Sequence, residues 1–234
     1  MIERIPFESL GAAEFGWLKA RHHISFGRYV DRDRMGVGAL RVWNDDEIAP
    51  GTGFDPHPHR DMEIVTYVRE GAITHEDSLG NRGRTEAGDI QVMSAGDGIV
   101  HGEFNREETA TRLFQIWFVP RTAGGEPWWE TRAFPERKPG GAFTALASGF
   151  PEDQAAGAIP INSDSALHAA RFAPGDVSEI ALAEGEQAYL VAADGALEVN
   201  GAAIGTRDGL RAAGPETLNI SATDASEVLL AVLR

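Results

Sequence analysis

The sequence lacks cysteine altogether, so disulfide bonds and thiolate metal ligands are both excluded. Basic residues are few: 21 Lys and Arg stand against 36 Asp and Glu, which gives a formal charge of -15. A chain this acidic is poorly suited to direct contact with nucleic acid or with an anionic membrane. Apolar runs of membrane-spanning length are also missing, and the N-terminus shows no signal-peptide pattern. We therefore expect a cytoplasmic enzyme or a cytoplasmic binding protein.

Short apolar segments separated by Gly and Asp turns fill most of the 234 residues. Such spacing is typical of antiparallel barrels and sandwiches. The sequence therefore predicts an all-β protein with two strand-rich halves, which we place at residues 1–135 and 136–234. The clearest predicted strands are 38–43, 62–68, 72–75, 90–93, 99–101 and 112–118 in the first half, and 187–193, 196–200, 217–221 and 227–233 in the second.

A segment rich in Pro, Gly and charge lies between the two halves, from Pro120 to Pro139. It carries the pair Trp128-Trp129, whose large apolar rings favour burial. We interpret the segment as a connector, with both tryptophans packed at the interface between the halves.

The two halves share a weak internal repeat. Placing Gly71 on Gly195 aligns the apolar segments that precede them and sets alanines opposite His57 and His59. These alanines are Ala181 and Ala183. If the halves are duplicates, the second has lost its candidate ligands, and we expect one metal ion per chain.

The most informative stretch is His57-Pro58-His59. Residues i and i+2 of a strand point to the same side, and Pro58 disfavours the helical alternative. An extended segment here therefore aims two imidazoles at one point. His101 and Glu103 repeat the same spacing downstream. Three neutral histidine nitrogens and one carboxylate suit a divalent first-row metal, so the sequence predicts a metal site.

The identity of the carboxylate ligand stays open at this level. Glu63 competes with Glu103, because residues 57, 59, 61 and 63 would share one face of a continuous strand. His75 lies in the approach to a turn, and we expect it to be an exposed or internally satisfied histidine.

These residues resemble the cupin pattern, and more narrowly the pirin family of bicupins. The first cupin motif is matched by Gly51, His57, His59 and Glu63, and the second by Gly98, His101 and Asn105. The pirin resemblance rests on the runs HPHRDME at 57–63 and SAGDGIVHGE at 94–103. It implies two cupin-type β-barrels in one chain, with a metal in the N-terminal barrel alone.

By this resemblance the metal ligands are His57, His59, His101 and Glu103, and Glu63 is left outside the ligand set. Glu103 is then also the expected catalytic base. Glycine stands at position 102, where the family commonly has serine. Because the change removes a hydroxyl near the metal, we expect it to alter rate or substrate preference more than ligation.

Several bacterial pirins cleave the flavonol quercetin with O₂, so the resemblance implies a monomeric metal-dependent dioxygenase that opens a flavonol ring. Fe²⁺ is the expected cofactor, and Ni²⁺, Cu²⁺, Zn²⁺, Mn²⁺ and Co²⁺ are compatible with the same ligands. The vertebrate member is a nuclear iron protein that acts as a transcriptional co-regulator. The alternative function is therefore a non-catalytic metal-binding regulator that acts through a protein partner. A metal isomerase or a small-molecule-binding cupin is a third candidate, because a fold does not determine a function.

Overall fold

The computed structural model describes residues 2–134 and 138–234, and these fold almost entirely into strands. Helical structure within these residues is confined to a 3₁₀ turn at Phe7–Ser9 and to α1 at Pro151–Ala155. None of the described helices has the length and apolar character needed to cross a membrane. The expected all-β class is confirmed. The expected boundary between residues 135 and 136 lies outside the described residues.

The first half of the chain forms two facing sheets. Its strands are β2 Gly11–Glu14, β3 Leu18–His22, β4 Leu40–Ile48, β5 Gly53–His59, β6 Glu63–Glu70, β7 Ala72–Asp77, β8 Arg82–Glu86, β9 Ile90–Ser94, β10 Ile99–Phe104, β11 Thr111–Phe118 and β12 Trp128–Arg132. A seven-stranded sheet has the order β12-β9-β6-β11-β4-β3-β2, and a four-stranded sheet has the order β5-β10-β7-β8. Together they make the first barrel.

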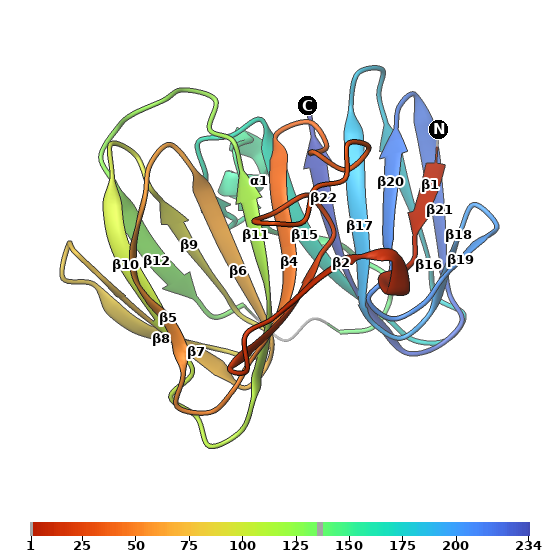
Figure 1. Cartoon of the computed structure of the whole chain (residues 1–234). Coiled ribbons are helices and arrows are strands. Elements are labelled where there is room, and N and C mark those ends of the chain that lie inside the picture. The colour runs from red at the N-terminus through yellow and green to blue at the C-terminus, as the bar shows by residue number, and fades with distance from the viewer. Residues whose placement is uncertain (1, 135–137) are drawn as a thin grey trace.

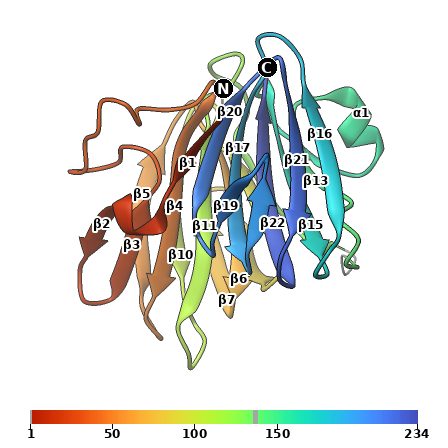
Figure 2. The ribbon, with the colours of Figure 1, turned by 90° about the vertical axis from the view of Figure 1, so that its right-hand side faces the viewer.

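The second half repeats this plan. Its strands are β1 Ile2–Ile5, β13 Thr144–Ser148, β14 Ile159–Pro160, β15 Ser165–Phe172, β16 Val177–Leu182, β17 Gln187–Asp194, β18 Leu197–Val199, β19 Ala202–Ile204, β20 Gly209–Ala213, β21 Glu216–Ala222 and β22 Ser226–Leu233. The sheet orders are β1-β20-β17-β22-β15-β13-β14 and β16-β21-β18-β19. The amino-terminal β1 pairs with β20, so residues 2–5 belong to the second barrel (Figure 2).

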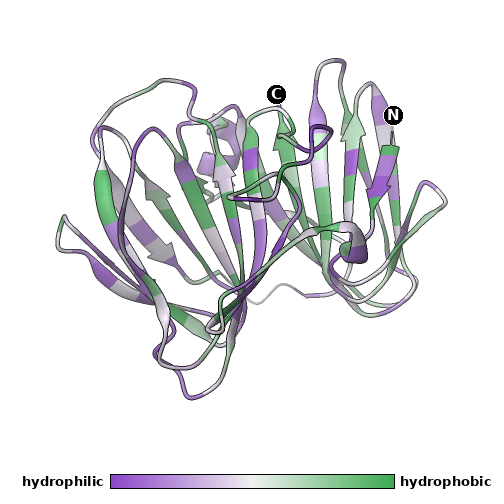
Figure 3. Ribbon diagram, in the orientation of Figure 1, coloured by the Kyte–Doolittle hydropathy of each residue, from purple (hydrophilic) through white to green (hydrophobic). Residues whose placement is uncertain are grey.

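The two seven-stranded sheets face each other in the middle of the molecule, and the four-stranded sheets lie on the outside (Figure 1). Side chains from both large sheets share one buried cluster, in which the Trp43 and Tyr189 ring centroids are 5.5 Å apart. Hydrophobic residues recur along the central strands (Figure 3), and β6 and β17 are buried over most of their length, as in sheets covered on both faces. Burial of the apolar faces therefore holds the two barrels together.

Buried polar contacts also cross this interface. The carboxylate of Asp45 accepts hydrogen bonds from Arg69 of the first barrel and Arg207 of the second. The Tyr67 hydroxyl likewise donates to Glu227 across the interface. Because each of these bonds needs its partner in one place, they fix how one barrel sits on the other.

The predicted connector contains a strand of the first barrel. β12 pairs with β9, and neighbouring residues of a strand point to opposite faces. Trp128 therefore packs against the cluster between the barrels, as expected. Trp129 packs instead against Ile64 and Met93 in the first barrel, so its expected place at the interface is wrong.

The internal repeat is visible in the topology. β6 lies between β9 and β11, and β17 lies between β20 and β22, at matching places in the two sheets. Each of these strands is followed by a glycine with positive φ, Gly71 at +75° and Gly195 at +78°. In the outer sheets β5 corresponds to β16, where Ala181 and Thr217 form the pair that matches His57 and His101.

Candidate metal centre

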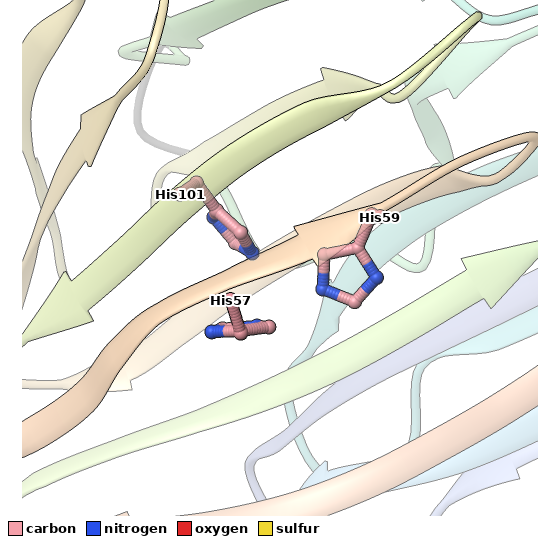
Figure 4. Close-up of side chains that lie close together, drawn as sticks. All are labelled: His57, His59 and His101. Carbon is pink, nitrogen blue, oxygen red and sulfur yellow. The ribbon is translucent and has the colours of Figure 1, made fainter.

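Three histidines come together inside the first barrel. β5 supplies His57 and His59, and the antiparallel neighbour β10 places His101 directly opposite His57. Their ring centroids are 4.6 to 5.0 Å apart. Figure 4 shows the three rings turned toward one another. Among the described residues, one potential ligand nitrogen from each ring lies within 4.8 Å of the others.

The free atoms of these rings fit a metal ion. Nε2 of His59 and Nε2 of His101 are buried and have no hydrogen-bond partner within the described part of the chain. An unpaired buried polar atom costs about 1–3 kcal/mol, so a missing ligand is its simplest explanation. The ring of His57 points Nδ1 at the carbonyl oxygen of Asp55, 2.7 Å away, which leaves its Nε2 for a ligand.

The protonation of the cluster also favours metal binding. Desolvation by burial, aided by the neighbouring imidazoles, lowers the pKa of His59 to about 4 and that of His101 to about 2. Both rings are therefore neutral near pH 7, and a neutral imidazole is the form that ligates a metal. His57 and His59 are partly exposed while His101 is buried, so solvent reaches the cluster from one side.

Glu103 lies two residues beyond His101 on β10, after a break in the register between β10 and β5. Its carboxylate is not part of the group of ligand atoms within 4.8 Å. It is held instead from the opposite sheet, by the side-chain amides of Gln91 and Gln115 and by the Thr66 hydroxyl at 3.2 Å. Burial raises the pKa of Glu103 to about 7 against the opposing effect of these hydrogen bonds. Its role as a ligand stays a prediction.

Glu63 faces away from the histidines. It opens β6 of the seven-stranded sheet, whereas His57 and His59 belong to β5 of the other sheet. Asp61, with φ of +49°, lies in the turn between them, so the shared strand face expected for residues 57 to 63 is wrong. Glu63 accepts a hydrogen bond from Ser94 at 2.7 Å. Burial raises the pKa of Glu63 as well.

His75 is internally satisfied, as one of the two expectations had it, but the sequence did not indicate that it lies beside His101. It is fully buried on β7, with Nδ1 3.4 Å from Nδ1 of His101 and Nε2 3.0 Å from the Asp77 carboxylate. The indole of Trp129 stacks on the ring at 4.6 Å with an interplanar angle of 6°. Desolvation lowers the pKa of His75, against the effect of Asp77, so the ring is neutral. The i, i+2 spacing of His75 and Asp77 matches that of the ligand pairs and was the available signal.

Position 102 does not face the cluster. His101 and Glu103 point inward, so a side chain at residue 102 would point to the opposite face of β10. A Cβ there would lie 2.9 Å from the Phe104 ring and 3.1 Å from the Phe54 carbonyl oxygen. The expected loss of a hydroxyl beside the metal is therefore wrong.

Aromatic rings border the histidines. The Trp117 ring meets His59 edge to face at 4.9 Å, and Phe54 lies 6.4 Å from His57. Further along β11, Phe114, Ile116 and Phe118 lie in the buried cluster between the barrels. Trp117 and Phe54 are therefore the aromatic side chains nearest the exposed part of the cluster among those with ring contacts to His57 and His59.

Comparison with known proteins agrees with this fold. The family model described as Pirin matches residues 6–118, and the one described as Quercetinase C-terminal cupin domain matches residues 146–231. A Pseudomonas aeruginosa protein, provisionally named quercetin 2,3-dioxygenase, is 56% identical over 98% of both chains. The Escherichia coli protein named quercetin 2,3-dioxygenase is 38% identical over 94% of this chain and 93% of its own length.

A solved structure extends the likeness to the whole fold. The bacterial pirin YhhW from Escherichia coli, in complex with nickel(II), is 37% identical, has a TM-score of 0.93, and is matched over 100% of this chain and 99% of that one. The two family matches correspond to the two barrels, which confirms the expected bicupin architecture. The chain belongs to the pirin family.

Proposed function

We propose that this protein is a metal-dependent dioxygenase that opens the ring of a flavonol such as quercetin with O₂. The observation that carries the proposal is the convergence of three histidines, each with one potential ligand nitrogen within 4.8 Å of the others and with Nε2 left free. Relatives named for quercetin dioxygenation support the reaction class.

We assign one divalent ion per chain to the first barrel, with His57, His59, His101 and Glu103 as ligands. Fe²⁺ is the proposed native ion, and the nickel(II) complex of the related YhhW supports a site open to other first-row metals. The equivalent strands of the second barrel carry Ala181 and Thr217, which offer no comparable ligand.

Glu103 is the group suited to move a proton at this centre. An ion at the histidines supplies a Lewis acid that favours the deprotonated form of an enolic hydroxyl. Glu103 is the carboxylate that accepts the proton of the flavonol 3-hydroxyl. The amides of Gln91 and Gln115 hold the carboxylate in place for this transfer. Addition of O₂ to the electron-rich ring then opens it with loss of carbon monoxide.

The test is O₂ consumption by metal-replete protein with quercetin, compared with its 3-methyl ether. We expect uptake with quercetin, little with the ether because it has no 3-hydroxyl proton to give to Glu103, and none after chelation. Glu103→Gln should also lose uptake. If no 3-hydroxyflavone supports uptake while the protein shows chelator-sensitive binding to a cellular protein, the regulatory function replaces this one.

A further inference from the structure

Asp77, His75 and the candidate ligand His101 form a continuous line of polar contacts on two neighbouring strands of the four-stranded sheet. β7 carries His75 and Asp77 on one face and pairs with β10, which carries His101. Nε2 of His75 lies 3.0 Å from Oδ2 of Asp77, and Nδ1 of His75 lies 3.4 Å from Nδ1 of His101. The side chains of His75 and Asp77 are both fully buried.

The Asp77 carboxylate determines which atom donates and which accepts in each of these hydrogen bonds. An ionised carboxylate only accepts, so Nε2 of His75 carries the hydrogen that faces Asp77. The neutral ring of His75 then has a lone pair on Nδ1, and the hydrogen between the two rings belongs to Nδ1 of His101. A neutral His101 with hydrogen on Nδ1 has a bare Nε2, which is the buried atom without a partner.

Asp77 is itself fixed by the turn after β7. Its Oδ1 accepts from the backbone N–H groups of Leu79 at 2.9 Å and Asn81 at 3.0 Å. Its Oδ2 accepts from the Asn81 side chain at 2.9 Å as well as facing His75. Oδ1 thus binds the backbone of the turn, and Oδ2 binds both the Asn81 side chain and His75.

The orientation of the His75 ring is fixed by packing against Trp129. Trp129 stacks on it at 4.6 Å, and the strand neighbour of His75 in β8 is Gly83. A Cβ at residue 83 would lie 2.3 Å from Cη2 of Trp129, so the indole occupies the space that a side chain there would fill. Packing therefore fixes the ring in the orientation that the hydrogen bonds require.

We propose that Asp77 and His75 are positioning residues, which hold His101 in the tautomer that presents a bare Nε2 to the divalent metal. The proposal rests on the metal site of the proposed function and adds two residues to it. Loss of such outer partners of a ligating histidine typically weakens metal binding about 10–100-fold. A purely structural role for His75 predicts no change in the tautomer of His101.

Asp77→Asn distinguishes a positioning role from a purely structural one, because it replaces one hydrogen-bond acceptor by a donor. With its oxygen retained by the Leu79 and Asn81 N–H groups, the new amide nitrogen faces His75. His75 then carries its hydrogen on Nδ1, and His101 must move its own hydrogen to Nε2. The turn keeps the acceptor for its two backbone N–H groups and loses only the one for the Asn81 side chain, so we expect the fold to be preserved while the metal-facing nitrogen is blocked.

Two substitutions at residue 75 complete the design. His75→Leu fills the same space with an apolar side chain but removes the acceptor that faces His101. His75→Asn restores an acceptor near the position of Nδ1 and serves as the rescue variant. His168→Leu is the matched control, because His168 is a largely buried histidine beside Asp153, 3.8 Å away, in the second barrel.

The readouts are the His101 ring tautomer, from nitrogen NMR of metal-free protein, and the Ni²⁺ dissociation constant, from chelator competition. We expect hydrogen on Nδ1 in the wild type, His75→Asn and His168→Leu, with similar Ni²⁺ affinities. Asp77→Asn and His75→Leu should shift hydrogen to Nε2 and weaken Ni²⁺ binding about 10–100-fold.

Failure of the two proposals gives different results. If the wild type binds no Ni²⁺, the proposed metal function is contradicted, while the tautomers of the metal-free variants still test the line to His101. If the wild type binds Ni²⁺ but Asp77→Asn and His75→Leu leave tautomer and affinity unchanged, the positioning role is overturned. Matching amide NMR spectra show that each variant is folded, and Asp77→Asn decides the question if His75→Leu is not.

Discussion

Metal binding should release a proton from Glu103, and the amount should depend on pH in a way that identifies the ligand. A carboxylate must be deprotonated to ligate a metal. Burial raises the pKa of Glu103 to about 7 in the metal-free protein. Below that pH the group therefore holds a proton that the incoming ion expels.

The size of the effect follows from this pKa. A group with a pKa of about 7 is about 0.9 protonated at pH 6 and about 0.1 protonated at pH 8. The pKa values of His59, about 4, and His101, about 2, make them minor proton sources at pH 6. Glu103 should thus add about 0.9 released protons per metal at pH 6 and about 0.1 at pH 8.

The assay is calorimetric titration of the metal-free protein with Ni²⁺ in buffers of different ionisation enthalpy. The contribution of Glu103 is the difference between the wild type and Glu103→Gln, which cancels protons from all other groups. Glu63→Gln is the matched control, because Glu63 is also buried with a raised pKa but bonds to Ser94. It should release as many protons as the wild type.

Two results would refute the reasoning. Equal proton release by the wild type and Glu103→Gln at both pH values would show that Glu103 does not lose a proton to the metal. Loss of the pH 6 release in Glu63→Gln, with Glu103→Gln unchanged, would make Glu63 the ligand.

Two further predictions concern stability. The pKa of Glu103 is about 7 in the folded, metal-free protein and 4.5 in the unfolded chain, so the folded state binds this proton more tightly. The free energy of unfolding should therefore fall by about 3 kcal/mol as pH rises from below 4.5 to above 7. Urea unfolding should show this slope reduced in Glu103→Gln, and an unchanged slope would contradict the burial argument. Asp45→Asn should cost about 3 kcal/mol in urea unfolding, because the buried charge between Arg69 and Arg207 is lost. The control Glu47→Gln removes two partly exposed ion pairs, to Lys19 and Arg112, and should cost under about 1 kcal/mol.

Local spacing was enough to predict the histidine cluster. His57 and His59 share a strand face whatever the strand pairs with, and the structure places His101 opposite them. The same argument failed for Glu63, because it assumed that one strand continues through a turn. The left-handed conformation of Asp61 ends that strand, and nothing in the local pattern required it.

The remaining site residues depend on pairings between distant segments. His75 acquires its role from the register of β7 on β10, and Trp129 reaches it because β12 pairs with β9. Likewise the first residues of the chain join β20, about two hundred positions away. Such registers are set by the packing of whole sheets, which single-sequence periodicity does not report.

The most direct test of the metal centre is elemental analysis of the purified protein beside the double variant His57→Ala/His101→Ala, with His168→Ala as a control. The wild type and His168→Ala should each carry about one equivalent of a divalent first-row metal, and the double variant essentially none. A full equivalent retained by the double variant, or metal lost from His168→Ala alone, would contradict a single centre at the histidines of the first barrel.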